Sequence, residues 1–193
     1  MALCDILIDS DITSKCEDPF YGGYKNIGYI VNLDDIDSWS HDEGVVDEFI
    51  LKEGKKLFKI QSIGTQPTPT TQTFVKGNFY NKWNNTVNLA LLDHSPEAVN
   101  NIIKPMSSGA RFVVFLEHRK MITTKGDSGL ESAETFEVFG LTKGLQLQDG
   151  ASREEYNEEL DGGWNLPLEE LGAPVPSYFI HKSFIDPFLT PEV

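Results

Sequence analysis

The segment from Ala110 to Glu117 (ARFVVFLE) is the strongest strand signal in the chain. It consists almost entirely of aliphatic, β-branched and aromatic residues, which favour the extended conformation. Turn-forming residues bound it, since Ser107, Ser108 and Gly109 precede it. We therefore expect a sheet to organise this fold, with other segments supplying its remaining strands.

Several other segments have the composition or the alternation of strands. Tyr24–Val31 is aromatic and β-branched, and in 86–92 the apolar Val87, Leu89 and Leu91 alternate with smaller or polar residues. Strands are predicted for 24–31, 57–63, 74–80, 86–92, 110–117, 135–139 and 145–148, and for a last segment in which Trp164, Leu166 and Leu168 alternate. The turn between the third and fourth of these falls at 81–85, and Pro167 indicates an edge or irregular position for the last.

One short helix is predicted after residue 94. Ser95 can cap it and Pro96 suits its first position. Val99, Ile102, Ile103 and Met106 form an apolar stripe at helical spacing. Pro105 and the Ser-Ser-Gly that follows end it, so a helix this short has to lie on a larger sheet.

The remaining segments are predicted as loops or as a tail. Residues 34–48 contain seven carboxylates and 149–161 contain six, which favours solvated acidic loops. The segment 65–73 (TQPTPTTQT) is either an arm reaching a neighbouring molecule or an ordinary surface loop. The predicted fold class is therefore mainly β, a sandwich or barrel with one short flanking α-helix and long loops. It spans residues 1–180 as one domain, followed by a Pro- and Phe-containing C-terminal arm, 181–193.

Charge and composition exclude several functions. The chain has 193 residues, with 16 Lys and Arg against 30 Asp and Glu, a formal net charge of −14. A module that grips nucleic acid by its phosphates needs clustered Lys and Arg, which this composition does not supply. No apolar run approaches the roughly 18–20 residues of a membrane helix, and the start of the chain lacks the basic region of a signal peptide. Cys4 and Cys16 have no metal-binding spacing.

No catalytic or metal-binding pattern emerges. Asp93, His94 and Ser95 are adjacent in the chain, whereas the members of a catalytic triad converge from separate positions. Calcium-loop spacing fails from Asp35 and from Asp9, because neither frame has glycine at its sixth position or glutamate at its twelfth. His41, His118 and His181 are scattered. We therefore expect no enzyme, no metal site and no cofactor.

The order of several motifs resembles a phage protein family. The motifs are Cys4, Cys16-Glu17-Asp18, Gly22-Gly23-Tyr24-Lys25-Asn26-Ile27, Asn32-Leu33-Asp34-Asp35, Leu89-Ala90-Leu91-Leu92-Asp93, Arg111-Phe112-Val113-Val114-Phe115-Leu116-Glu117, Phe139-Gly140-Leu141 with Gly144-Leu145, Gly163-Trp164-Asn165-Leu166-Pro167-Leu168, and Ala173-Pro174 with Tyr178-Phe179-Ile180. In this order they resemble the tail tube-like virion proteins of Bacteroidetes phages, over most of residues 1–180. Three departures look like additions: the 149–161 loop, Pro167 and the tail 181–193. They favour comparison with the stacked ring proteins in the short tails of crAss-like phages.

The resemblance implies a structural role in the virion. Subunits of this kind form a ring of the tail, sixfold or twelvefold, which lines the channel for genome passage. The implied partners are copies of the chain, adjacent tail or portal-proximal ring proteins, and DNA that passes without specific binding; no membrane is involved. The implied location is the virion tail, assembled in the cytoplasm of the bacterial host.

Two groups of residues follow as candidate sites. Carboxylates facing the channel would repel DNA phosphates and let the genome slide. The candidates are Glu43, Asp47, Glu154, Glu155, Glu158 and Glu159. Contacts between subunits or rings are assigned to the Thr/Pro segment, the helix and the tail, with Thr68, Thr70, Val99, Ile103, Tyr178, Phe179, Phe184 and Phe188 as candidates. For the tail, an inter-subunit clamp is preferred over packing on its own domain.

Two other classes remain open. The first is another virion role, a head–tail adaptor or a tail terminator, which would form a ring that stops after one layer. The second is a carbohydrate-binding β-sandwich, suggested by Trp39, Trp83, Trp164 and the many Asn residues. That class requires exposed and coplanar aromatic rings.

Overall fold

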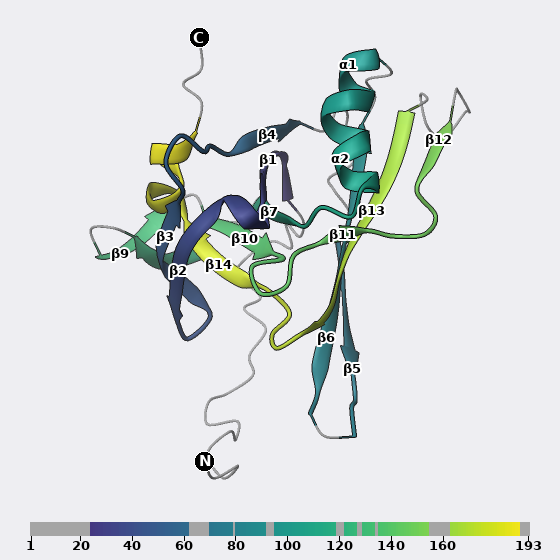
Figure 1. Cartoon of the computed structure of the whole chain (residues 1–193). Coiled ribbons are helices and arrows are strands. Elements are labelled where there is room, and N and C mark those ends of the chain that lie inside the picture. Colours follow the sequence, from purple (N-terminus) through teal and green to yellow (C-terminus); the bar gives the residue numbers. More distant parts are fainter. Residues whose placement is uncertain are drawn as a thin grey trace.

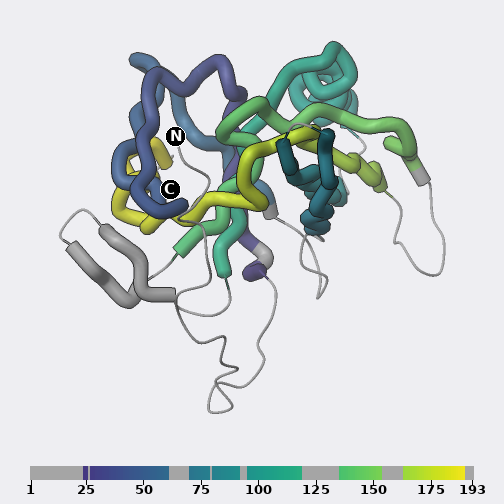
Figure 2. The backbone as a smooth tube through the Cα atoms, turned by 90° about the horizontal axis from the view of Figure 1, so that it is seen from below, coloured from purple at the N-terminus to yellow at the C-terminus, as the bar shows by residue number. Residues whose placement is uncertain are grey.

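The computed structural model describes residues 24–61, 70–78, 80–91, 95–118, 122–126, 129–133, 135–154 and 163–189. Over these residues the chain is mainly β, with two sheets, a small hairpin and short helical turns (Figure 1). The predicted fold class is confirmed at this level. The tube view in Figure 2 shows the same two parts side by side, joined through the middle of the molecule.

The larger sheet has seven strands. In spatial order they are β2 (Ile36–Asp42), β3 (Val45–Leu51), β14 (Tyr178–His181), β10 (Thr135–Phe139), β7 (Phe112–His118), β1 (Tyr24–Asn32) and β4 (Phe58–Gln61). All neighbours pair antiparallel except β14 and β3, which are parallel. Strands distant in sequence therefore lie together at the centre.

The second sheet is built around one long strand pair. Its order is β11 (Gln146–Leu147), β13 (Gly163–Ala173), β6 (Lys82–Leu91) and β5 (Thr70–Val75), and β12 (Ser152–Glu154) also pairs with β13. β8 (Ile122–Gly126) and β9 (Gly129–Ala133) form a separate hairpin. In Figure 1 the β5–β6 hairpin extends away from the body of the molecule.

Strand β7 supplies side chains to two separate cores. Val113 and Phe115 lie in the first core, whereas Val114 and Leu116 lie in the second. All four are buried, and the alternation follows from the two-residue period of a strand. The predicted strand at 110–117 is thus confirmed in substance, beginning at Phe112, and both of its faces are covered.

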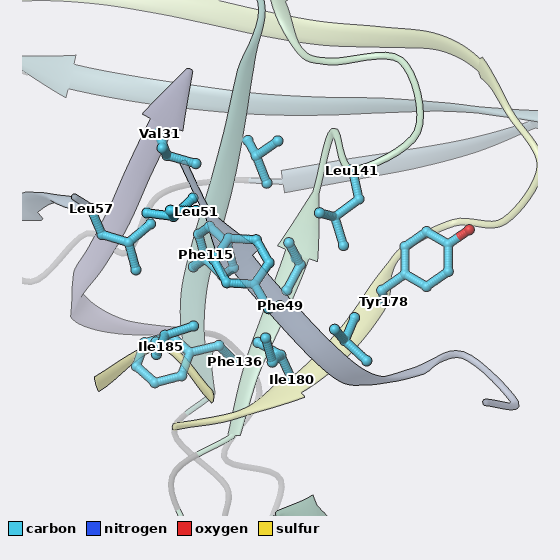
Figure 3. Packing of buried hydrophobic residues seen from close by; sticks show 13 residues of the cluster. Val31, Phe49, Leu51, Leu57, Phe115, Phe136, Leu141, Tyr178, Ile180 and Ile185 are labelled. Atoms are coloured by element: carbon cyan, nitrogen blue, oxygen red, sulfur yellow. The ribbon is translucent and has the colours of Figure 1, made fainter. Parts of the chain in front are cut away.

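The first core lies against one face of the larger sheet. Figure 3 shows Phe49 and Phe115 at its centre, with their rings packed edge to face at 5.4 Å. Two 3-10 turns, η3 (Lys182–Phe184) and η4 (Asp186–Phe188), complete it and bury Ile185 fully. Residues 181–189 of the predicted arm therefore belong to the domain.

The second core lies between the two sheets and a helix. The helix consists of α1 (Pro96–Ala98), a π-helical turn η2 (Val99–Ile103) and α2 (Lys104–Ser107), and Met106 is buried beneath it. The predicted cap is confirmed, because the Ser95 Oγ accepts a hydrogen bond from the Ala98 N–H at 3.1 Å. Pro105 lies inside the helix, at the start of α2 and directly after the π-helical turn η2. This turn is wider than an α-helical turn, which accommodates the proline.

The predicted acidic loop at 34–48 is wrong. After a short turn, η1 (Leu33–Asp35), β2 and β3 form a hairpin with Glu43 and Gly44 as its turn. Both have positive φ, 48° and 83°, as in the two-residue turns that match strand twist. Val46, Phe49 and Leu51 face inward while the carboxylates remain exposed or half-buried. The number of carboxylates concealed the alternation.

The boundaries of the β5–β6 hairpin also differ from the prediction. The segment 81–85, predicted as a turn, lies within β6 from Lys82 on, and β5 begins at Thr70 rather than at Phe74. Cross-strand pairs such as Phe74 with Trp83 explain the shift, because they extend the ladder toward the end of the hairpin. A short strand, β12, likewise interrupts the predicted 149–161 loop.

Pro167 lies in an inner strand rather than at an edge. Its carbonyl accepts a hydrogen bond from the Gln148 N–H at 2.9 Å, and the N and C=O of one strand residue point to the same side. The missing N–H therefore points into the interval between the end of β11 and the start of β12. The ladder between β13 and β6 stays intact at the Pro167–Asn88 pair.

The close approach at Gly140 gives the first prediction. Gly54→Ala is expected to lower the free energy of unfolding by about 1–2 kcal/mol, because its φ of 74° disfavours a Cβ although nothing lies nearby. Gly140→Ala is expected to cost about 1–3 kcal/mol more, because its Cβ would lie 2.5 Å from the Phe112 carbonyl oxygen. Urea unfolding of both variants measures the difference, and equal losses would contradict the packing described for Gly140.

Candidate functional site

The predicted channel-facing carboxylates are spread over two parts of the molecule. Glu43 is exposed at the turn of the β2–β3 hairpin, and Asp47 on β3 accepts a hydrogen bond from the Ser40 Oγ at 2.6 Å. Glu154 ends β12, on the other sheet. Glu155, Glu158 and Glu159 lie outside the described residues. The structure therefore does not bring Glu43 and Asp47 together with β12 (Figures 1 and 2).

The predicted interface residues on the helix and on β5 are partly accessible. Val99 is exposed, whereas Ile103 is half-buried against the second core. Thr70 is half-buried at the start of β5, and its Oγ1 donates to the Tyr24 Oη at 3.4 Å. Thr68 lies outside the described residues. Thr70 therefore has a partner within its own chain.

The C-terminal segment from residue 178 to residue 189 packs on its own domain. Tyr178 is only 5% exposed and meets the Trp39 ring edge to face at 5.2 Å. Phe184 and Phe188 pack against the same first core, and the Leu57 N–H donates to the Phe188 carbonyl at 3.0 Å. Within one chain these aromatic rings therefore pack on the larger sheet, and the clamp from Tyr178 to residue 189 stays a prediction. Phe179 is half-buried and stacks with His118 at 5.9 Å.

A buried carboxylate at the junction of the two sheets was missed by the sequence analysis. The Glu137 Oε2 accepts from the Tyr24 Oη at 2.5 Å and lies 2.9 Å from the His118 Nε2. Its Oε1 accepts from the Gln72 Nε2 at 2.8 Å and from the Ser177 Oγ at 2.5 Å. These partners come from β1, β7, β5 and the segment before β14, so one carboxylate connects four parts of the chain.

The hydrogen bonds determine the electrostatics of this cluster. Burial alone would raise the pKa of Glu137, but the hydrogen bonds from His118, Ser177, Tyr24 and Gln72 outweigh it and hold that pKa below its ordinary value. Burial and the neighbouring Glu137 carboxylate raise the pKa of Tyr24. The cluster is therefore a fixed buried charge with about four acceptor positions filled, which suits holding two sheets together.

The sequence does contain a signal for this cluster. Residues 135–139 (TFEVF) form an apolar strand with one carboxylate in the middle, and all five residues are buried. A buried charge has to be paired or hydrogen-bonded, so a glutamate in such a strand indicates polar partners on neighbouring elements. Next to it, the buried Glu117 pairs with Lys25.

The end of the β5–β6 hairpin exposes apolar side chains. Phe74 is 50% exposed, Tyr80 is 69% exposed, and Leu171 on the adjoining β13 is 57% exposed. The Phe74 ring meets Trp83 edge to face at 5.4 Å, so both strands contribute to this surface. Exposed apolar groups gathered on one projecting element are typical of contact surfaces.

Among the described residues, no three His, Cys, Asp or Glu side chains gather where they could hold a metal ion. No helix in that part of the chain has both the length and the apolar character needed to cross a membrane.

The chain matches no protein-family model, no curated protein and no solved structure in the comparisons made with them.

The Glu137 cluster gives a prediction for stability. Glu137→Gln is expected to lower the free energy of unfolding at pH 7 by about 2–4 kcal/mol, because an amide cannot accept from all four donors. Glu48→Gln, at an exposed carboxylate on β3, is expected to change it by less than about 0.5 kcal/mol. Urea unfolding of the two variants makes the comparison.

The same pair of variants tests the pH dependence. Because the folded pKa of Glu137 is lowered from 4.5, its charge stabilises the fold above pH 4.5, and this stabilisation is lost as the pH falls through the folded value. Wild type and Glu48→Gln should therefore lose stability below pH 4.5 more steeply than Glu137→Gln. Parallel losses in all three would show that Glu137 does not contribute.

Proposed function

We propose that this chain is a structural protein of a bacteriophage tail, a subunit that assembles with copies of itself into a ring lining the channel for the genome. The mainly β fold with one short helix agrees with the architecture that the motif resemblance implies. The observation that carries the proposal is the projecting β5–β6 hairpin with its exposed Phe74, Tyr80 and Leu171. Such a surface on a water-soluble domain calls for a partner.

The net charge of the chain supports a role in lining a channel for DNA. A net charge of −14 repels DNA phosphates, so a ring of such subunits lets DNA pass without holding it. This repulsion depends on the total charge of the subunit and not on one loop. The carbohydrate-binding alternative loses support because its three tryptophans do not share a surface. Trp39 packs against the first core. Trp83 and Trp164 lie at opposite ends of the ladder between β6 and β13.

The first test of the proposal is assembly. The purified chain is examined by mass photometry and negative-stain imaging over a range of concentrations. Closed rings or stacks of rings are expected, and a ring of a single layer that never stacks would favour the adaptor or terminator role. A chain that stays monomeric at every concentration, and also fails to join tail rings when added to disassembled tails, would contradict the proposal.

The second test asks whether the hairpin makes the contact. Phe74→Ser combined with Tyr80→Ser is expected to abolish rings while leaving a folded monomer, because both side chains are exposed and outside the two cores. The matched control is Phe58→Ser, since Phe58 is 51% exposed on β4 of the other sheet. Ring formation is measured for each variant. Rings that survive the hairpin changes, or that are lost equally with Phe58→Ser, would show that the contact lies elsewhere.

A further inference from the structure

We infer that the end of the β5–β6 hairpin binds the β2–β3 hairpin of a neighbouring copy of this chain, so that the subunit contact joins two different surfaces head to tail. This inference rests on the proposed function, because it names the two surfaces of the ring contact. We call the first the basic hairpin (70–91) and the second the acidic hairpin (36–51).

The two hairpins carry opposite charge. Between residues 36 and 51 the chain has five carboxylates and neither Lys nor Arg, whereas from residue 54 to 92 it has no carboxylate at all. Lys76 is exposed and Lys82 half-buried on the basic hairpin. Lys143 lies beside them, because its Nζ donates to the Gly172 carbonyl at 2.6 Å and the Lys82 side chain flanks the same glycine. The neighbouring carboxylates on β13 are Glu169, which is half-buried, and Glu170, which is buried and accepts a hydrogen bond from the Lys143 N–H at 2.9 Å. In a chain of net charge −14, the exposed part of this group is a local excess of positive charge.

The charges on the acidic hairpin are available to a partner. Asp37, Asp42 and Glu48 are exposed, and none of them forms an ion pair among the residues that the structure describes. By contrast, Asp34 and Asp35, which precede the hairpin, are paired with Arg111 and Lys55. Arg111 and Lys55 therefore neutralise the two carboxylates just before the acidic hairpin, and the hairpin itself remains negatively charged.

Each hairpin also offers apolar surface to the other. Ile50 on β3 is 40% exposed and pairs across the hairpin with Ser38. The basic hairpin presents Phe74, Tyr80 and Leu171. An apolar centre with complementary charges around it is the composition of a specific protein contact, in which the charges select and orient the partner.

The geometry directs this contact to a second copy. β2 is the last strand at one end of the larger sheet, and β5 is the last strand at one end of the second sheet. Figures 1 and 2 both draw the two hairpins apart, on different sides of the molecule. A chain with two complementary surfaces that do not meet within one molecule makes a heterologous contact, which closes into a ring when the rotation between subunits allows it.

The test reverses the charge of each hairpin in the full chain. One variant carries Lys76→Glu with Lys82→Glu, and the other carries Asp42→Lys with Glu48→Lys; thermal unfolding verifies that each is folded. Each variant alone is expected to raise the concentration for half-assembly at least about tenfold. Two combinations are expected to restore assembly: the four changes in one chain, and an equal mixture of the two variants, which can alternate around an even-numbered ring.

The outcomes separate this inference from the proposed function. If the wild-type chain forms no ring by itself and joins none when it is added to disassembled tails, the proposed function fails. If wild type forms rings and the reversed variants do so equally well, the function stands and the hairpin contact is overturned. Loss in both variants without restoration in the mixture or in the combined chain also overturns it. The hairpin contact is also overturned if the basic hairpin binds single-stranded DNA rather than a second copy of the chain. In that case the variant with Lys76→Glu and Lys82→Glu would lose binding to a labelled oligonucleotide but would still form rings.

Discussion

The two-sided burial of β7 is the constraint on which the rest of the structure depends. Its side chains alternate between two cores, with Phe115 in the first and Val114 in the second. A strand buried on both faces needs a cover on each side. The β2–β3 hairpin and the 3-10 turns of the tail cover one side, while the second sheet and the helix cover the other. The order of elements along the chain agrees with this, because residues 178–189 return to complete the first core.

Where the two sheets meet, hydrogen bonds to a buried carboxylate add to the packing of the second core. Glu137 lies on β10 and accepts hydrogen bonds from Tyr24 and Ser177 in the region of the larger sheet and from Gln72 on the second. A buried carboxylate that is fully hydrogen-bonded costs little when every partner is in place and a great deal when one is removed. It therefore penalises any sliding of one sheet over the other. The cluster is best understood as a device for alignment, since its carboxylate is saturated by donors from the chain itself.

The elements that depend on local pattern were predictable from the sequence, and those that depend on distant partners were not. The strand at Tyr24–Asn32 and the cap at Ser95 follow from residues within a few positions of each other. The β2–β3 hairpin was missed because its carboxylates outnumber the inward residues, although Gly44 is a favourable turn residue. The Glu137 cluster could be suspected from a carboxylate in an apolar strand, but its partners lie between 19 and 113 residues away. Pro167 is tolerated because its missing N–H faces the interval between β11 and β12. No local sequence pattern predicts that interval.

The shape of the proposed ring depends on the same internal features. A head-to-tail contact between two hairpins of opposite charge propagates the angle between them, and a small error in that angle turns a closed ring into an open helix. The acidic hairpin belongs to the larger sheet and the basic hairpin to the second. The angle between them is therefore set where the sheets join, by the second core beside β7 and by the hydrogen bonds of Glu137. In the proposed assembly the buried carboxylate acts on ring closure at a distance, since it fixes the relative position of two surfaces that it does not touch.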